Sequence, residues 1–594
     1  MSRGVERQVM DVDIACVGFG PATAGFLTTL ARNLVNPDGS PAIESRVMPG
    51  LPLQVVCYER AGDVGFGVSG VVTRARGIRA SLPEIDFSRV PMAAPVVSEH
   101  LVYLLDPAGA SRRSFALRMA DRAIRMLRLH SHCGYELPYV PPFLRKDGGV
   151  VLSVGQFLQH MAGEISSTGL VQVWPGMPVA EALPGETKAS VAGIRLADQG
   201  GEPGMDIHAA LTVIGDGPVG AVGRQLDERI GMPQGHHRRE WALGMKFVVD
   251  LPEGTGLEAG TVFHTFGYPE PEIFGFFYVH PGNVASVGIF IPSWFRSPMR
   301  TAYRYLQHFA LHPYLWRYLE GGKLRSWGAK SLEESGRRGE PFLTGDGFAR
   351  IGEGSGSTNV LTGSGVDEAW TTGTLLAEAV VELARQSRPF TRENLERTYV
   401  ARRRASWLEA EGRIAEKARD GFHHGVVTGL MGMALAGITG GRASLSGEPR
   451  PMPTVEEFYT GKIRAEEVQR IVANCQARSV PVHDALMDAS GWPAIPFDGQ
   501  LLVTHQDALL VGGKVQAPAG FADHVRFRYP YLCERCGSKL CIEMCSGQAI
   551  VPGPDGVPAF DREKCVYCGA CVWNCPNGSI AFSAGAGGLH SNEN

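Results

Sequence analysis

Near its C-terminus the chain reads Cys533-Glu-Arg-Cys536-Gly-Ser-Lys-Leu-Cys541-Ile-Glu-Met-Cys545 and then Cys565-Val-Tyr-Cys568-Gly-Ala-Cys571-Val-Trp-Asn-Cys575-Pro576. These two runs hold eight of the twelve cysteines of the chain. They also repeat internally, because Cys541 and Cys571 are thirty residues apart, as are Cys545 and Cys575. The spacing predicts a small pseudo-symmetric module built around its sulfur atoms.

The second run has the spacing of bacterial ferredoxins, in which three close thiolates bind one [4Fe–4S] cluster and the fourth cysteine serves the other cluster. We therefore predict two clusters with crossed ligands. One would be bound by Cys545, Cys565, Cys568 and Cys571, and the other by Cys533, Cys536, Cys541 and Cys575. The four-residue spacer between Cys536 and Cys541 departs from the usual two residues and lengthens one loop.

Three alternatives stay open for these cysteines. Paired Cys-x2-Cys units also bind structural zinc, although three cysteines at two-residue spacing before x3-Cys-Pro are rare in zinc ribbons. Disulfides are disfavoured, since we expect no signal peptide and the other four cysteines are scattered. A single cluster beside a vestigial second site is the third alternative.

The overall composition is that of a globular protein. Its 594 residues suffice for about three domains. Hydrophobic residues make up 44% and charged residues 20%, and the net charge of −4 gives no reason to expect nucleic acid as a partner. No run reaches the roughly 18–20 apolar residues that cross a bilayer. We expect no membrane span, while contact with a membrane surface stays open.

Residues 11–31 read as a strand, a glycine turn and a helix, which is the setting of a dinucleotide-binding site. Thr23 replaces the third glycine of the usual pattern, and an ordinary βα turn is the alternative. Residues 53–60 read as the second strand and lead to Glu59, which is placed to accept hydrogen bonds from an adenosine ribose. The predicted contacts of the turn itself are Gly18, Gly20, Pro21 and Ala22.

Two later glycine turns strengthen the prediction of FAD. The first follows a predicted strand at about 210–214, and the second leads into a helix predicted at about 367–387. Large FAD proteins of the glutathione-reductase class bring three such turns to one cofactor, because glycine lets backbone N–H groups approach it. No second dinucleotide pattern follows, so we predict that the electron donor is a protein. The predicted contacts in these turns are Gly215, Asp216, Gly352, Glu353 and Gly365.

From about residue 10 to its C-terminus the chain resembles the electron transfer flavoprotein–ubiquinone oxidoreductase family, including its FixC/FixX-type bacterial relatives. The resemblance implies FAD, iron–sulfur and quinone sites in one monotopic membrane protein. It also implies that the single cluster of the family maps onto Cys545, Cys565, Cys568 and Cys571, so the other four cysteines are an addition. The most specific matches are those cysteines, His264-Thr-Phe-Gly-Tyr-Pro269, His312-Pro313, Leu319-Glu-Gly-Gly-Lys323, Gly328-Ala-Lys330, residues 352–360 and His424-Gly425.

The segment 243–295 alternates apolar and polar positions and predicts strands of a mixed sheet. The resemblance implies that this sheet and nearby loops bind the quinone. Our candidates for the headgroup site are Phe274, Gly275 and Phe276. The alternative is that these aromatic residues belong to the core.

Two apolar segments are candidates for membrane contact. The resemblance implies that the proline-rich segment 137–144 is a contact loop. Residues 426–438 are uncharged and too short to span a bilayer, and basic residues flank them on both sides. This pattern favours an interfacial anchor, with a buried core helix as the alternative.

The predicted fold class is α/β and α+β, in three domains and a connector. The FAD-binding domain, of the glutathione-reductase (Rossmann-like) type, takes residues 10–90, 150–240 and 330–400. The mixed-sheet quinone-binding and membrane-contact domain takes residues 91–149, 241–329 and 401–445. The connector is 446–500, and the ferredoxin-like two-cluster domain is 501–594.

Clusters carry single electrons, a quinone needs two, and a flavin holds one or two, so a chain with both cofactor types converts between the two regimes. We predict an electron transfer flavoprotein:quinone oxidoreductase, peripheral on the cytoplasmic side of the bacterial inner membrane, without an assigned catalytic acid or base. Its predicted donor is electron transfer flavoprotein or a ferredoxin-like carrier. The alternatives are a ferredoxin-linked or electron-bifurcating subunit, a non-catalytic electron-relay subunit, and a flavin reductase of the geranylgeranyl type.

Overall fold

The largest sheet contains the strand that precedes the first glycine turn. The structure is a computed structural model that describes residues 6–67, 70–363, 365–511, 514–516, 519–585 and 588–590. The strand order is β17-β18-β11-β1-β2-β8, with β10 and β9 continuing from β11. The parallel strands are β1 (Val9–Val17), β2 (Val55–Tyr58), β8 (Val171–Trp174), β11 (Asp206–Ile214) and β18 (Phe348–Arg350). The antiparallel additions are β9 (Val179–Pro184), β10 (Val191–Leu196) and β17 (Thr344–Gly345).

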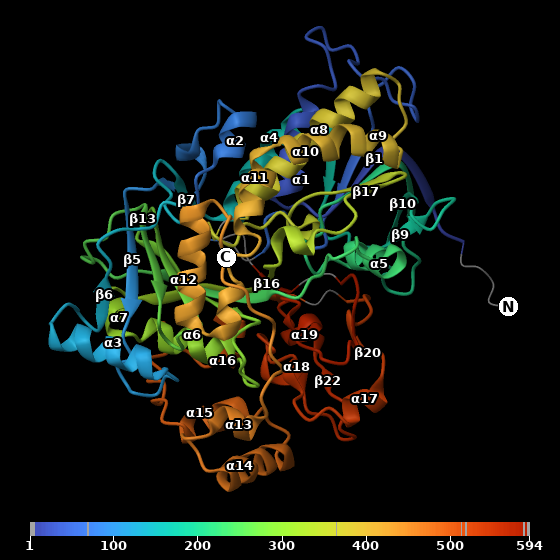
Figure 1. Cartoon of the computed structure of the whole chain (residues 1–594). Coiled ribbons are helices and arrows are strands. Elements are labelled where there is room, and N and C mark those ends of the chain that lie inside the picture. Colours follow the sequence, from blue (N-terminus) through green and yellow to red (C-terminus); the bar gives the residue numbers. More distant parts are fainter. Residues whose placement is uncertain are drawn as a thin grey trace.

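Helices cover both faces of this first sheet, as buried parallel strands require (Figure 1). Successive residues of β1 point to opposite faces. Ile14 packs with α1 (Pro21–Ala31), α4 (Val154–Ser167) and α8 (Val366–Arg385), whereas Ala15 packs with α5 (Ala221–Ile230). Helix α8 confirms the predicted helix at 367–387.

The second sheet has seven strands in the order β16-β12-β15-β14-β13-β5-β6. All neighbours are antiparallel except β13 and β5, so the predicted mixed sheet is confirmed. The strands are β5 (Ser98–Leu104), β6 (Gly134–Glu136), β12 (Trp241–Asp250), β13 (Thr261–Phe266), β14 (Phe274–His280), β15 (Val284–Pro292) and β16 (Lys323–Glu333).

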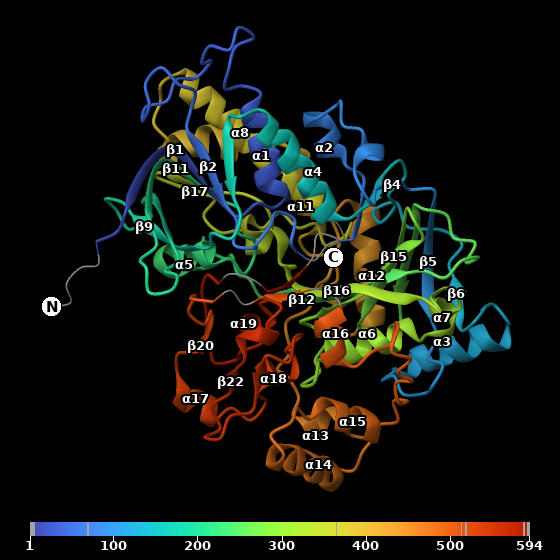
Figure 2. The same cartoon turned by 180° about the vertical axis from the view of Figure 1, so that it is seen from behind.

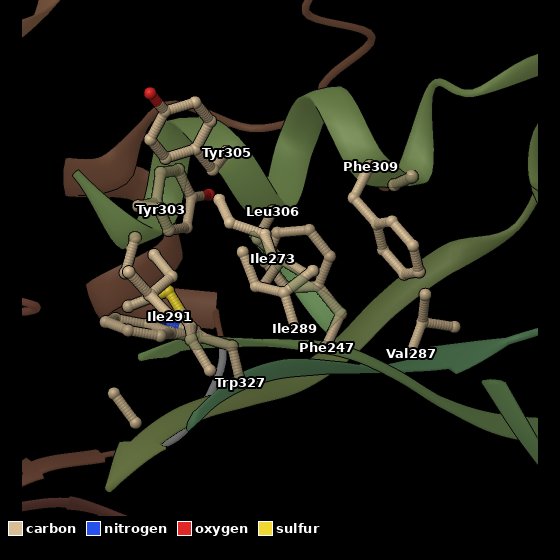
Figure 3. Close-up of a cluster of buried hydrophobic side chains, with 14 of the residues drawn as sticks. Phe247, Ile273, Val287, Ile289, Ile291, Tyr303, Tyr305, Leu306, Phe309 and Trp327 are labelled. Carbon is tan, nitrogen blue, oxygen red and sulfur yellow. The ribbon is translucent and has the colours of Figure 1, made fainter. Parts of the chain in front are cut away.

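The two faces of the second sheet have different neighbours. On one face Phe247, Val287 and Ile289 meet α6 (Ala302–Ala310), and this is the larger core of the molecule (Figure 3). On the other face Phe276 packs with Val151 of a small sheet made of β3 (Val71–Thr73), β4 (Ala94–Pro95) and β7 (Val150–Leu152). This second face therefore looks toward the half that carries the first sheet.

The segment predicted as a connector, 446–500, contains three helices. They are α13 (Val455–Tyr459), α14 (Ala465–Ala477) and α15 (His483–Ala489), and α14 confirms the helix predicted near 464–477. Buried Phe458, Leu486 and Trp492 join the core of the second sheet. The segment is therefore packed structure as well as a connection.

The C-terminal module lies beside α5 and β16, away from α3 (Figures 1 and 2). Its ordered elements are α17 (Pro530–Glu534), α18 (Leu540–Glu543), α19 (Ala570–Trp573), the hairpin β21 (Ile550–Val551) with β22 (Ala559–Phe560), and β20 (Val525–Phe527) paired with β23 (Ile580–Phe582). Ahead of it come α16 (His505–Val511) and β19 (Lys514–Gln516), which pairs with β24 (Gly588–His590).

The remaining helices lie around the two sheets. They are α2 (Arg76–Ser81), α3 (Phe115–Met126), α7 (Pro313–Leu319), α9 (Arg392–Leu395), α10 (Ala401–Ala405), α11 (Trp407–Ala415) and α12 (Val426–Thr439). No helix in the described part of the chain combines the length and apolar character that crossing a membrane requires.

Candidate cofactor sites and membrane face

The three glycine turns predicted to contact FAD converge at the carboxyl edge of the first sheet. Gly18 has a φ of +82°, and a Cβ there would lie 2.9 Å from the carbonyl oxygen of Gly215. A Cβ on Gly352 would lie 3.0 Å from that of Ala22. The first, second and third turns thus touch one another, as one shared ligand requires.

The N-terminus of α1 faces open space. Gly20 is its N-cap, Pro21 occupies its first turn, and no described side chain caps it. A Cβ built on Gly20 meets no described protein atom within 4 Å, and the same holds for Gly365, the N-cap of α8. Both helix N-termini therefore open onto space beside them, which fits a pyrophosphate or another anionic part of a dinucleotide.

The three predicted acidic residues contact the backbone around these turns. Glu59 accepts hydrogen bonds from the backbone N–H groups of Phe19 (2.8 Å) and Ala61 (2.9 Å), so it lies directly beside the first turn. Asp216 accepts from the first turn of α5, and burial raises its pKa. Glu353 accepts from Glu333 N at 2.9 Å, which ties the third turn to β16. Asp216 and Glu353 thus position the backbone around the second and third turns.

The eight cysteines fall into two groups in space. The outer sulfur group is Cys533, Cys536, Cys541 and Cys575, which line one cavity together with Lys539 and Pro576. The inner sulfur group is Cys545, Cys565, Cys568 and Cys571. Burial, and then the charges of Cys568, Cys565 and Cys545, raise the pKa of Cys571 well above its ordinary range. The fold therefore brings together the two crossed sets that the spacing predicts.

Both sulfur groups have the donors and the burial that suit cluster ligands. Backbone N–H groups of Ala549 and Ser579 donate to the sulfur atoms of Cys545 (3.1 Å) and Cys575 (3.2 Å), and hydrogen bonds of this kind to sulfur are typical of cluster ligands. Burial raises the pKa of Cys545 to about 11 and that of Cys541 to about 12, so metal binding must displace their protons. Among the described residues, no three His, Cys, Asp or Glu side chains form a site for a single metal ion.

The inner sulfur group is docked onto the rest of the molecule. Ser331 N of β16 donates to Cys568 O at 2.9 Å, and Trp573 Nε1 donates to Ser331 Oγ at 2.8 Å. The Arg60 guanidinium lies 3.8 Å from the centre of the Tyr567 ring. Because Arg60 follows Glu59, the inner sulfur group lies next to the first glycine turn as well as the second sheet.

The residues proposed for the quinone headgroup lie on two faces of β14. Phe276 stacks on Tyr278 with ring centroids 4.6 Å apart, on the face of the second sheet that looks toward the half carrying the first sheet. Gly275 points to the opposite face, where a side chain would collide with Phe309. Strand alternation causes this division. The headgroup site itself stays a prediction, because a glycine contacts a ligand through its backbone rather than through a side chain.

A buried polar line lies on the same face as Phe276 and escaped the sequence analysis. Lys246 Nζ donates to Ser286 Oγ at 3.4 Å, and Ser286 Oγ lies 2.9 Å from His280 Nε2. His280 Nδ1 donates to Met92 O at 2.8 Å, which leaves Nε2 of the neutral ring as the acceptor. Burial lowers the pKa of Lys246 to about 7 and that of His280 to about 4. In the sequence, the signal that could have revealed this polar line was a lysine inside the apolar run 243–249.

Helix α3 is the other feature that the sequence analysis missed. Asp121 is its only buried residue among those described, and it pairs with buried Arg113. The apolar side chains instead face outward: Phe115 is 71% exposed and Met126 is 81% exposed. Arg118 and Arg122 lie between them in the sequence and are exposed too. A helix with this pattern fits an interfacial position better than water.

Helix α12 is half exposed. Its small residues Gly429, Gly432 and Ala436 face the protein, whereas Met431 and Ile438 are 62% and 84% exposed. It is therefore neither a fully buried core helix nor a helix without contacts to the rest of the protein. Phe143 of the segment 137–144 contacts α12 at Gly437, so the two segments predicted to meet the membrane lie together.

Comparison with known proteins identifies two matching family models. The model described as "ETF-QO, ubiquinone-binding" matches residues 241–332, and the 4Fe-4S binding domain matches residues 558–581. The first match covers most of the second sheet, and the second covers Cys565, Cys568, Cys571 and Cys575.

Comparison over longer stretches of the chain finds similar proteins and solved structures. Electron transfer flavoprotein-ubiquinone oxidoreductase of Pseudomonas aeruginosa is 26% identical over 422 residues, covering 68% of this chain and 70% of the relative. The probable enzyme of that name from Acinetobacter baylyi is 27% identical, covering 64% and 63%. A geranylgeranyl bacteriochlorophyll reductase-like protein from Thermoplasma acidophilum has a TM-score of 0.49 and 14% identity, covering 78% of this chain and 99% of that one.

Proposed function

We propose that this chain, which is related in sequence to the electron transfer flavoprotein–ubiquinone oxidoreductases, passes electrons from a reduced carrier protein through iron–sulfur clusters and FAD to a membrane quinone. The observation that carries the proposal is the docking of the inner sulfur group between the first glycine turn and the second sheet. The matches to a ubiquinone-binding domain and a 4Fe-4S binding domain support it. Quinol is the product.

The residues would divide the work as follows. Gly18, Gly20 and Gly365 would hold FAD through backbone contacts, with Glu59 at its ribose end. A bound flavin supplies the conversion between single electrons and the electron pair of quinol. The face of the second sheet that bears Phe276 would hold the quinone between the two halves and keep water away from it.

Two [4Fe–4S] clusters are proposed, with the outer and inner sulfur groups as their ligands. The cavity lined by Cys533, Cys536, Cys541 and Cys575 supports the second one. Iron and sulfide analysis of the anaerobically purified protein should find about eight of each. About four irons, or zinc, in fully loaded protein would contradict the second cluster.

The three predicted domains are proposed as functional units. The first half would bind FAD, and the second sheet would bind quinone. The module from about residue 501 would carry the clusters. The packed helices α13–α15 would hold that module to the second sheet through the buried core they share with it.

Contact with the cytoplasmic surface of the bacterial inner membrane is proposed for α3, α12 and the segment 137–144. Their outward apolar side chains support it, and a lipid-soluble quinone would enter from that surface. Exchanging Val427, Met431 and Ile438 for Asn should reduce binding to phospholipid vesicles without unfolding the protein. Leu430 and Met433 are poorer choices, because they pack against buried residues.

FAD binding is tested at Gly20. Because a Cβ there meets no protein atom within 4 Å, Gly20→Val should fold normally and lose flavin through collision with the cofactor. Gly163→Val, at an exposed position of α4 where a Cβ likewise meets no described atom within 4 Å and φ is not left-handed, is a control outside the turns. Full flavin occupancy in the folded Gly20→Val protein would place FAD elsewhere.

The identity of the electron donor distinguishes the main proposal from its nearest alternative. Quinone reduction should be assayed with reduced electron transfer flavoprotein and with reduced ferredoxin. Turnover with the flavoprotein is expected. Turnover with ferredoxin alone would favour a ferredoxin-linked oxidoreductase, which the second cluster suits. No turnover with either donor would favour a relay subunit.

A further inference from the structure

The two halves of the cluster module differ at one structurally equivalent position. The thirty-residue repeat that relates Cys541 to Cys571 also relates Lys539 to Gly569. Both residues are the N-cap of a short helix, α18 and α19, and both are in the left-handed region, with φ of +39° and +73°. Glycine adopts this conformation readily, whereas a lysine resists it.

The inner half requires glycine for a reason that the outer half lacks. A Cβ on Gly569 would lie 2.8 Å from Val219 Cγ2, where the module docks on the second glycine turn. The Lys539 side chain instead points toward Cys533 and Gly556 of the module itself. This direction leaves room for a side chain at 539, but does not explain a strained lysine there.

The contacts of Lys539 supply the explanation. Its Nζ donates to Cys533 O at 3.0 Å and also to Gly556 O, so the ammonium is held between two segments beside the cavity. Among the described residues lining that cavity, Lys539 carries the only charge apart from the thiols. The unusual four-residue spacer between Cys536 and Cys541 contains this lysine.

We propose that Lys539 sets the potential of the outer cluster by holding a fixed positive charge beside it. This inference rests on the proposed binding of a cluster by the outer sulfur group. Reduction adds one electron to a site already bounded by four thiolates, without breaking a bond or moving a proton. A fixed cation stabilises the more negative, reduced state and so raises the reduction potential. The reduced donor supplies the electron, and the inner cluster accepts it in turn.

The test compares three substitutions in the full-length, cluster-loaded protein by potentiometric titration followed by electron paramagnetic resonance. Lys539→Gly removes the charge, relieves the backbone and copies the inner half. Lys539→Gln removes the charge but keeps an N–H donor for the two carbonyl groups, and Lys539→Arg keeps the charge. We expect the first two to lower the equilibrium constant for reduction of the outer cluster about tenfold, or about 59 mV for one electron. Lys539→Arg should stay close to the parent.

A matched control lies beside the inner run. Lys564 precedes Cys565 and pairs with Asp561 at 3.2 Å, outside the outer cavity, so Lys564→Gln should leave the outer potential unchanged. Equal potentials in the parent, Lys539→Gly and Lys539→Gln, with eight irons retained, would overturn the role of Lys539 alone. Loss of four irons in all three Lys539 variants would make it a folding residue and also overturn the proposal. Only four irons in the parent would instead overturn the outer cluster itself.

Discussion

The inner and outer sulfur groups of the cluster module come from two cysteine runs that both end in Cys-x3-Cys, yet the rest of the molecule contacts the two groups differently. The inner half is covered by Arg60, Val219, Trp241 and Ser331 from the rest of the chain. The cavity of the outer sulfur group is lined by residues of the module itself, and the exposed side chains of Tyr529 and Tyr531 lie on and beside α17. Helix α18, which carries Cys541, docks on α15 instead, because Glu543 accepts hydrogen bonds from the backbone N–H groups of Val482 and His483. The two copies of the motif therefore have different neighbours, and repetition of a motif does not imply repetition of its surroundings.

The largest expected effect separates the two sulfur groups. On the proposed path, in which electrons reach FAD through the inner sulfur group, Cys545→Ser should remove the inner cluster and reduce quinone reduction to background. Cys575→Ser should remove the outer cluster only, although Cys575 is close to Cys571 in sequence. Electron paramagnetic resonance would identify the cluster that is lost. Loss of the inner signal in Cys575→Ser would break the crossed assignment.

Metal removal should follow the same order. Mild oxidation with a chelator should release the four irons of the outer group before those of the inner group, since the rest of the chain covers the inner group. Iron release and loss of cluster absorbance would be followed over time. Simultaneous release of all irons would mean that docking does not protect the inner cluster.

A matched pair of glycine substitutions measures the docking itself. Gly569→Ala adds left-handed strain and a collision with Val219, whereas Gly578→Ala adds strain alone, because a Cβ there meets nothing within 4 Å. We expect Gly578→Ala to cost about 1–2 kcal/mol and Gly569→Ala about 1–3 kcal/mol more. Denaturant unfolding followed by cluster absorbance would give both values. Equal losses would argue against a tight contact at Val219.

The smallest effect concerns a single hydrogen bond. Ser331→Ala leaves Trp573 Nε1 without its acceptor while keeping the backbone bond to Cys568, so it should cost about 1 kcal/mol. The inner cluster should become somewhat easier to release, and the outer cluster should be unaffected. Ser167→Ala, which removes an exposed hydrogen bond to Glu164 O at the end of α4, serves as a control outside the module. An equal effect on both clusters would mean that this contact stabilises the module as a whole.

The sequence predicted the features that depend on local spacing. The cysteine runs indicated two crossed sulfur sets, and the strand–turn–helix segments located the three glycine turns, because both signals are carried by neighbouring residues. It did not show that Gly275 and Phe276 lie on opposite faces of the second sheet, since the face of a strand residue depends on how the strand is placed in its sheet. It also missed α3, because its apolar residues resemble an ordinary core stripe until the fold shows that Asp121 faces inward.

By itself, then, the sequence determined which groups are available to bind cofactors. These groups are thiols at ferredoxin spacing and glycine turns whose backbone N–H groups suit a dinucleotide. Only the tertiary structure decided which sulfur group touches the half that carries the first sheet, which face of the second sheet bears Lys246 and Phe276, and which helix turns apolar side chains outward. The physical reason is that ligand spacing is a property of adjacent residues. Docking, strand register and exposure depend instead on contacts between segments hundreds of residues apart, such as Val219 with Gly569 and Ser331 with Trp573.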